Sequence, residues 1–462
     1  MANAVCFWAL IAGRTIAGGS AINGMMYLRG QPGDFDRWRD EAGCTGWSFA
    51  DVLPFFKRAE GSERGGGPWH GGAEPIRIPR GRSHFPIADA FLRTVAEAGL
   101  PLVDDLNADA LEGFGFYDGA VLNGRRMTAG AYLRDAADRR ALDLLTGARV
   151  IGLTALGDRI DGVRYLCGGR TLEAKATGEV ILAAGCVHTT QLLLLSGIGP
   201  TPMLQALGVP ILADRRGVGE NLQNHVAYTL RYALEAPVTA FEYRRMVPAL
   251  QAGAAFLLGR EGVLSGLPCP VGGVMRSDPA LARADTQVIL GAGIPGRHAG
   301  LRAMLPAQSG FILMVNQGQP FSRGSIGLRS ADPLAAPVIR SGHLADPRDR
   351  AVLANAVERL RDLLAEHAIG GSKARDVDAD RYCNCESLLE TIARRAISYH
   401  HMVGACRMGS DQDAVVDPSL RVNGVRGLRV ADTSIAPLLV NGNTTPLALM
   451  IGERAADLIA SG

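Results

Sequence analysis

The sequence has no long apolar run and no marked excess of charge of either sign. The apolar run from Ala4 to Ala12 is far shorter than the roughly 20 residues needed to span a bilayer. No Lys or Arg precedes this run, so it is also a poor signal peptide. The formal net charge is only +2, which gives no indication of nucleic acid or of an anionic membrane as partner. We therefore expect no integral membrane segment, no nucleic-acid partner and a cytoplasmic location.

The sequence also lacks a recognisable cysteine pattern. Its eight cysteines are scattered, which suits a reducing compartment better than a disulfide scaffold. The spacing of Cys383 and Cys385 is not a usual zinc pattern. We predict no metal site. At 462 residues the chain is long enough for more than one domain and a sizeable core.

Two polar residues near the C-terminus are candidates for catalysis, His401 and Asn443. An imidazole titrates near neutral pH and can take a proton from a hydroxyl group. A carboxamide can hydrogen-bond an oxygen on which charge develops. Taken singly, a His–His pair is more often structural than catalytic, and an Asn beside a Gly is first a turn residue. Together they suit alcohol oxidation, provided that something accepts the hydride.

The motifs around these residues resemble the C-terminal block of the glucose–methanol–choline (GMC) family of flavin-dependent oxidoreductases. That block has His-Pro-x-Gly-Thr-x-x-Met-Gly, then Gly-Leu-x-Val-x-Asp, then Gly-Asn-Thr-Asn. Here Met402 replaces the usual Pro and Ala405 the usual Thr. By this resemblance His401 is the catalytic base and Asn443 the second catalytic residue. The resemblance also implies cofactor contacts from Asp432, Thr433 and Thr444.

An early glycine-rich segment, Gly13 to Met26, is similar to the first signature of the same family. A Gly-Gly-Ser turn that opens a helix could present N–H groups to a pyrophosphate, although most such loops are only turns. Ile22 stands where some family members carry a His bonded to the flavin, so any FAD here is expected to be non-covalent. The resemblance implies FAD contacts from Gly18, Gly19, Asn23, Gly24, Met26 and, further along the chain, Val150.

The remaining pattern predicts an α/β fold with an α+β substrate part. A buried strand at 179–183 and a helix at 189–196, joined at Gly185, are typical of a doubly wound sheet. The other strands and helices are expected at residues 142–146, 150–153, 162–166, 286–290, 311–315 and 325–328 (strands) and 351–365 (helix). We expect a Rossmann-like FAD-binding domain from residues 1–30, 125–225 and 400–462. A mixed-sheet lid and substrate-binding domain is expected from residues 31–124 and 226–399.

The family's first unit, a strand, Gly-x-Gly-x-x-Gly, a helix and a strand ending in an acid, has no counterpart in this sequence. About 30 residues, the size of one βαβ unit, are expected to be missing relative to the family pattern. A start site placed too late, a gene remnant or a fragment that works by another arrangement would explain this, and the first two are favoured. Either would leave the FAD-binding domain N-terminally truncated and weaken its hold on the cofactor.

The function expected from the resemblance is FAD-dependent oxidation of a small-molecule alcohol to an aldehyde or ketone. A dehydrogenase is favoured over an oxidase, and the electron acceptor stays open. Two alternatives remain. One is a flavin-containing lyase that cleaves cyanohydrins with the same His region, and the other is a non-catalytic remnant that holds no FAD. His225, His343 and His400 are expected to be bystanders.

Overall fold

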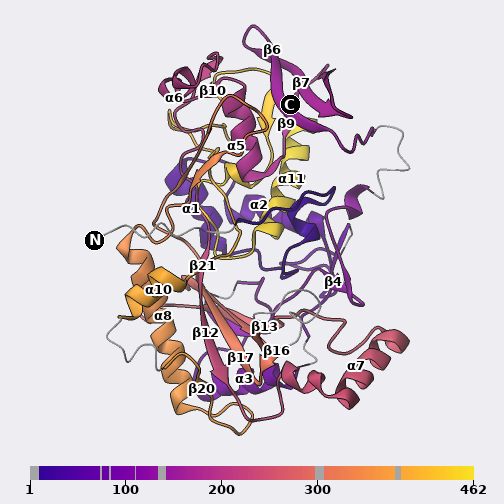
Figure 1. The fold of residues 1–462 in the computed structure, drawn as a ribbon, viewed down its shortest axis with the longest axis vertical. Helices are drawn as coiled ribbons and strands as arrows, with labels where there is room; N and C mark the ends of the chain where they lie inside the picture. Colours follow the sequence, from indigo (N-terminus) through magenta and orange to yellow (C-terminus); the bar gives the residue numbers. More distant parts are fainter. Residues whose placement is uncertain are drawn as a thin grey trace.

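The structure is a computed structural model that describes residues 10–72, 75–82, 85–109, 111–133, 142–296, 306–379 and 387–461. Cys383 and Cys385, which were not expected to bind a metal, lie outside the described residues. No helix among the residues described is long and apolar enough to cross a membrane. Figure 1 shows two bodies stacked along the long axis, an upper one around α5 and α11 and a lower one built on a large sheet. Helix α7 extends from the side of the lower body.

The helices of the described part differ widely in length. The α-helices are α1 (Pro32–Ala42), α2 (Phe49–Ala59), α3 (Pro86–Glu97), α5 (Gly185–Leu195), α6 (Thr201–Ala206), α7 (Met246–Gly259), α8 (Pro347–Glu366), α10 (Leu388–Arg395) and α11 (Thr444–Ala460). The 3₁₀ helices are η1 (Gly18–Ala21), η2 (Ala240–Arg244) and η4 (Thr433–Ile435).

A seven-stranded antiparallel sheet forms the centre of the lower body. Its strand order is β20-β12-β17-β14-β13-β3, and β21 also pairs with β12. The strands are β3 (Gly113–Phe116), β12 (Val226–Ala233), β13 (Val271–Met275), β14 (Thr286–Gly291), β17 (Gly310–Gln317), β20 (Arg375–Asp376) and β21 (Ile397–Ser398).

The two faces of this sheet have different partners because side chains alternate along each strand. On β17, Phe311 and Leu313 pack into a core with residues of α3 and α8. The intervening Met314 packs on the other face, against a cluster that contains Met26 and Leu28. One face of the sheet is therefore covered by helices. The opposite face meets the end of the glycine-rich segment and the residues that follow it.

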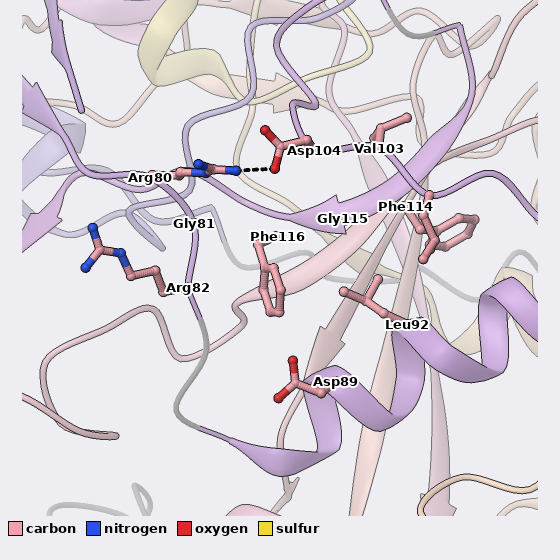
Figure 2. Close-up of a pocket in the computed structure, with 11 residues that line it drawn as sticks. Arg80, Gly81, Arg82, Asp89, Leu92, Val103, Asp104, Phe114, Gly115 and Phe116 are labelled. Atoms are coloured by element: carbon pink, nitrogen blue, oxygen red, sulfur yellow. Dashed lines mark hydrogen bonds and ion pairs between the residues drawn. The ribbon is translucent and has the colours of Figure 1, made fainter. Parts of the chain in front are cut away.

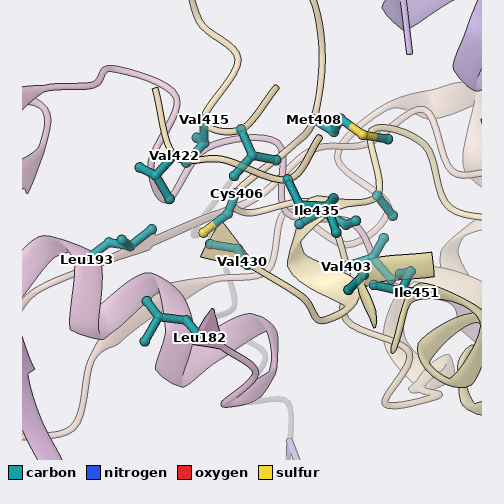
Figure 3. Packing of buried hydrophobic residues seen from close by; sticks show 14 of the residues in the cluster. Leu182, Leu193, Val403, Cys406, Met408, Val415, Val422, Val430, Ile435 and Ile451 are labelled. Atoms are coloured by element: carbon teal, nitrogen blue, oxygen red, sulfur yellow. The ribbon is translucent and has the colours of Figure 1, made fainter. Parts of the chain in front are cut away.

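The upper body holds a parallel strand pair, β9 (Val180–Leu182) and β22 (Leu428–Val430). Helix α5 follows β9 immediately and contributes Leu192, Leu193 and Leu194 to the largest core. The apolar residues of this core come from α1 and α2 as well as from the C-terminal quarter of the chain. Figure 3 shows how Cys406, Val430 and Ile435 meet Leu182 and Leu193 in it.

The other strands form small sheets around these bodies. The pairs and the one triplet are β1 (Glu60–Ser62) with β2 (Ile76–Ile78), β4 (Val121–Leu122) with β5 (Arg125–Arg126), β6 (Arg149–Leu156) with β7 (Arg159–Cys167) and β8 (Arg170–Lys175), β10 (Ile198–Gly199) with β11 (Ala213–Asp214), β15 (Ile294–Pro295) with β16 (Pro306–Gln308), and β18 (Ser325–Gly327) with β19 (Val338–Arg340).

A buried charged network links Arg29, Glu60, His70 and Asp105. Arg29 and Glu60 form an ion pair with fully buried side chains. His70 bonds Glu60 Oε1 at 2.9 Å through Nδ1 and Asp105 Oδ2 at 2.7 Å through Nε2. Burial opposes the charged imidazole, but the hydrogen bonds to Asp105 and Glu60 outweigh it and raise the pKa of His70 to about 9. His70 is therefore a cation held between two carboxylates at neutral pH.

This network makes stability depend on pH on the alkaline side. The folded pKa of about 9 exceeds the ordinary value of 6.5, so the contribution of His70 is complete below pH 6.5 and is lost as pH rises through 9. We expect the free energy of unfolding, measured by urea denaturation, to fall across this window. In His70→Asn the fall should be smaller. An equal pH dependence in the variant would contradict a charged His70.

Candidate functional site

Strand pairing places His401 next to β12. Strand β21 pairs with the start of β12 through Val226 and Ser398. The N–H of Tyr399 then donates to the backbone oxygen of His225 at 3.0 Å. The N–H of His401 donates to the side-chain oxygen of Asn224 at 2.7 Å. Two segments about 170 residues apart in the sequence are thus fixed side by side.

His225 and His401 contact each other directly. Their Nδ1 atoms are 2.8 Å apart, and Nε2 of His225 lies 2.9 Å from the carbonyl oxygen of Gly318. A carbonyl oxygen only accepts hydrogen bonds, so Nε2 of His225 carries the proton. The Nδ1 atom of a neutral His225 is then an acceptor, and Nδ1 of His401 is the donor. His401 is left with a free electron pair on Nε2, which bonds to no described residue.

Both imidazoles are held in the neutral form. Complete burial lowers the pKa of His225 to about 4. Burial, followed by repulsion from His225 and His400, lowers the pKa of His401 well below its ordinary value. The ring of Tyr399 packs edge-on against His401, with the ring centres 5.0 Å apart. At neutral pH His401 can therefore accept a proton. His225, which was expected to be a bystander, therefore lies in direct contact with His401 and is placed to fix its tautomer.

Asn443 stands at the N-cap of α11, but its side chain does not cap the helix. An asparagine at this position usually bonds the free N–H groups of the first turn. Here the backbone N–H of Asn443 donates to the oxygen of Leu28 at 2.8 Å. Its Oδ1 atom is buried and has no hydrogen-bond partner in the described part of the chain. A buried amide without a partner is costly unless a ligand satisfies it.

A short path of contacts joins the surroundings of His401 to those of Asn443. Gly318, whose oxygen accepts from His225, packs so closely on Asn441 that an added Cβ would lie 2.3 Å from the Asn441 side chain. Asn441 precedes Asn443 by two residues. That His401 and Asn443 act on one oxygen stays a prediction, and this path supports it.

The glycine-rich segment lies against the start of α11. Asn23 donates from Nδ2 to Thr445 Oγ1 at 2.8 Å, which places it one residue from Thr444. The predicted Gly-Gly-Ser turn does not open a regular helix, because Gly18 begins a 3₁₀ helix of only four residues. Beside it, a Cβ added to Gly19 or Gly24 would meet no atom within 4 Å. Met26, by contrast, is buried.

Asp432 and Thr433 follow β22 and contact two neighbouring segments. Thr433 donates from Oγ1 to the oxygen of Met402 at 3.1 Å, next to His401. Asp432 accepts from Gly185 N at 3.0 Å and from Thr189 Oγ1 at 2.5 Å, at the start of α5. Its carboxylate also accepts from Ser434 N at 2.9 Å. Asp432 therefore has protein partners and organises the carboxyl ends of the parallel strands.

Val150 lies at the start of β6 and is 37% exposed. The neighbouring Arg149 and Arg14, in the glycine-rich segment, are both near enough to His188 on α5 to lower its pKa, after burial. The start of β6 and the glycine-rich segment therefore each carry a cation within electrostatic reach of His188. The role of Val150 in cofactor binding stays a prediction.

The residues at the start of α11 fit the flavin end of FAD. Asn443 offers an unpartnered buried amide oxygen. Gly19 and Gly24 leave open space where a side chain would stand. Ile22 is 48% exposed beside them, so an apolar surface is available to a flat ring system. For the phosphate end, β9 and β22 form a parallel sheet of two strands at the start of α5.

A large open cavity of about 680 Å³ lies elsewhere, at the edge of the seven-stranded sheet. Figure 2 shows Phe114 and Phe116 of β3 facing Leu92 and Asp89 of α3, with Arg80 bonded to Asp104 at the rim. None of the predicted site residues lines it. Its charged side chains are balanced in sign. The candidate site is therefore not this cavity.

Comparison with known proteins agrees with the motifs. Two models of GMC oxidoreductases match residues 3–227 and 320–452. The oxygen-dependent choline dehydrogenase of Rhizobium etli (strain CIAT 652) is 36% identical over 455 residues, which cover 97% of this chain and 81% of that relative. The same protein of Brucella ovis is also 36% identical, with the same coverage.

Solved structures of similar proteins share the fold. Pyridoxine 4-oxidase from Mesorbium loti is 30% identical, with a TM-score of 0.84 over 98% of this chain and 85% of that one. An FAD-dependent oxidoreductase from Chaetomium thermophilum is 25% identical, with a TM-score of 0.88 over 98% and 87% of the two chains. The expected fold, an FAD-binding part with a second substrate-binding part, is confirmed. The chain belongs to the GMC oxidoreductase family, whose members use FAD as their cofactor.

Proposed function

We propose that this protein oxidises the CH–OH group of a small alcohol to a carbonyl, with non-covalent FAD as the electron acceptor and His401 as the general base. The hydrogen-bonded series from Gly318 through His225 to His401 carries the proposal. It fixes the tautomer of His401 and leaves its Nε2 free to take a proton. The relatives named for choline and pyridoxine make hydroxyl compounds of that size the first substrates to try.

The chain's own residues would move the proton and hold the oxygen. His401 Nε2 takes the hydroxyl proton, and Nδ1–H keeps its bond to His225. The Nδ2–H group of Asn443 donates a hydrogen bond to the same substrate oxygen as its negative charge grows. FAD supplies the two-electron acceptor for the hydride that leaves the carbinol carbon. The products are a carbonyl compound, a protonated His401 and reduced flavin, so atoms and electrons balance.

Binding of FAD would rest on the start of α11 and on the glycine-rich segment. We propose that Gly18, Gly19, Asn23 and Gly24 line the flavin with Thr444. Met26 and Thr433 complete this border near His401, and Val150 and Asp432 belong to the outer part of the site. Ile22 has no nucleophilic atom, so this position forms no covalent bond to the ring.

The test is anaerobic reduction of the FAD-loaded protein by an alcohol. Bleaching of the visible flavin band on mixing with choline or pyridoxine, with formation of the aldehyde, is the expected result. A flavin that a chemical reductant bleaches but that a panel of primary and secondary alcohols leaves oxidised would contradict the proposed activity. Release of cyanide from a cyanohydrin, without bleaching, would assign lyase activity instead.

A further inference from the structure

The side chain of Asn224 joins three segments of the chain around the candidate base. Its Oδ1 atom accepts from the backbone N–H of His401 at 2.7 Å. Its Nδ2 atom donates to Ser398 Oγ at 2.8 Å and to Nε2 of His343 at 3.1 Å. Asn224 lies just before β12, Ser398 ends β21, and His343 lies between β19 and α8. Asn224 is only 4% exposed, so solvent hardly competes for these bonds.

The orientation of the Asn224 amide follows from its partners. The backbone N–H of His401 only donates, so the oxygen of Asn224 faces it and the NH₂ group faces Ser398 and His343. Nε2 of His343 is then an acceptor, and the proton of its neutral ring is on Nδ1. Burial lowers the pKa of His343 to about 4, which keeps this ring neutral at neutral pH. His343 therefore favours the one amide orientation in which the oxygen of Asn224 reaches His401.

The backbone that Asn224 holds has a conformation that needs support. His400 has a φ of 62°, in the left-handed region that residues other than glycine rarely adopt. The N–H of His400 donates to Ser398 Oγ at 3.4 Å. The next N–H along the chain, that of His401, is the one bonded to Asn224. Two side chains that also bond each other, Ser398 and Asn224, therefore fix the turn that leads into the candidate base.

Two consecutive residues hold His401 at two different points. His225 bonds Nδ1 of its ring at 2.8 Å, and Asn224 bonds its backbone N–H. The first bond sets the tautomer, and the second sets the place from which the ring extends. We propose that Asn224, oriented by His343, is a positioning residue that keeps Nε2 of His401 at a fixed distance from the substrate hydroxyl. This inference rests on the proposed function, in which His401 is the general base.

Removal of the Asn224 side chain is expected to slow the chemical step. A displacement of about 1 Å can cost about 100-fold in rate. In Asn224→Ala we expect flavin reduction at saturating alcohol to be about 10- to 100-fold slower, as measured by stopped-flow absorbance. The alcohol concentration that gives half the maximal rate should change little, because Asn224 acts on the base and not on the substrate.

Conservative variants should restore the rate. In Asn224→Asp one carboxylate oxygen accepts from His401, and the hydroxyl of Ser398 can donate to the other. We therefore expect most of the rate to return. His343→Gln should also keep the rate, because its amide oxygen can accept from Asn224, whereas His343→Leu should lose part of it. Unchanged reduction in Asn224→Ala, or an Asp variant as slow as the Ala variant, would overturn the proposal.

Asn423→Ala is the matched control for general damage to the fold. Asn423 also donates from Nδ2 to a protein oxygen, that of Ala414 at 2.9 Å, but outside the site. Both Ala variants should have a lower melting temperature, because each loses a side-chain hydrogen bond. Only Asn224→Ala should also reduce its flavin more slowly. An equal loss of rate in Asn423→Ala would assign the effect to stability instead.

Hydrogen exchange at the amide of His401, followed by mass spectrometry, needs no substrate. Exchange should be faster in Asn224→Ala than in the unchanged protein and slow again in Asn224→Asp. Equal exchange in all three proteins would overturn the proposal. If exchange changes as expected but no alcohol reduces the flavin of the unchanged protein, the proposed function fails. Asn224 would then be a structural contact and not a positioning residue.

Discussion

Alcohol-dependent reduction of the FAD-loaded enzyme is expected to be about 10²–10⁴-fold slower in His401→Ala, the range in which a general base contributes. The reason is the fixed tautomer of this imidazole. Nδ1 of His401 is engaged by His225 at 2.8 Å, so Nε2 is the atom that can take the hydroxyl proton. Stopped-flow absorbance of the flavin at saturating alcohol measures the step directly. Reduction by a chemical reductant should not change.

The pH dependence of the same step tests the protonation state of His401. The base must be neutral to act, and burial lowers its pKa well below 6.5. The rate should therefore be level around neutral pH and fall only as pH drops through this lowered pKa. In His401→Ala this acid limb should disappear together with the rate. An acid limb that persists unchanged in the variant would assign it to another group.

The neighbouring histidine offers a matched control. His400 is exposed and adopts a positive φ of 62°, a conformation that asparagine tolerates well. We expect His400→Asn to reduce flavin at close to the unchanged rate. If His400→Asn lost as much activity as His401→Ala, the general base could no longer be assigned to His401. Unchanged reduction in His401→Ala would rule out His401 altogether.

The fold was predictable where side-chain periodicity reports burial directly. The strand expected at 311–315 is the middle of β17, and the helix expected at 351–365 lies within α8. The strand expected at 142–146 is absent, since residues 142–146 are exposed and pair with nothing. The start of α5 was misplaced by four residues, because Gly185, with φ of 81°, both ends the turn and begins the helix.

The candidate site was predictable only in part. His401 and Asn443 were identified from motifs, whereas the role of His225 depends on the pairing of β21 with β12, which no local pattern reveals. A signal existed all the same. His225 ends the sequence Gly-Val-Gly-Glu-Asn-Leu-Gln-Asn-His at residues 217–225, which is similar to a further conserved segment of the GMC family. Likewise, only the three-dimensional structure shows that the side chain of Asn443 does not cap α11 and that its Oδ1 atom has no partner among the described residues.

The largest loss of stability is expected from Glu60→Gln. The carboxylate of Glu60 is fully buried and bonds Arg29, and it also bonds His70 at 2.9 Å. Its removal leaves two cations facing each other without their shared anion. Breaking a buried ion pair costs about 3–5 kcal/mol, because the remaining charge stays desolvated. We expect the urea midpoint to fall accordingly, as followed by circular dichroism.

Two further variants separate this cost from general damage. Asp158→Asn breaks an exposed pair with Arg426, and its urea midpoint should not move. The double variant Arg29→Met/Glu60→Met removes both members of the buried pair and should be more stable than Glu60→Gln, because no unpaired guanidinium remains. Should the double variant be the less stable of the two, the ion pair itself would be stabilising. The attraction between Arg29 and Glu60 would then exceed the free-energy cost of removing both charges from water.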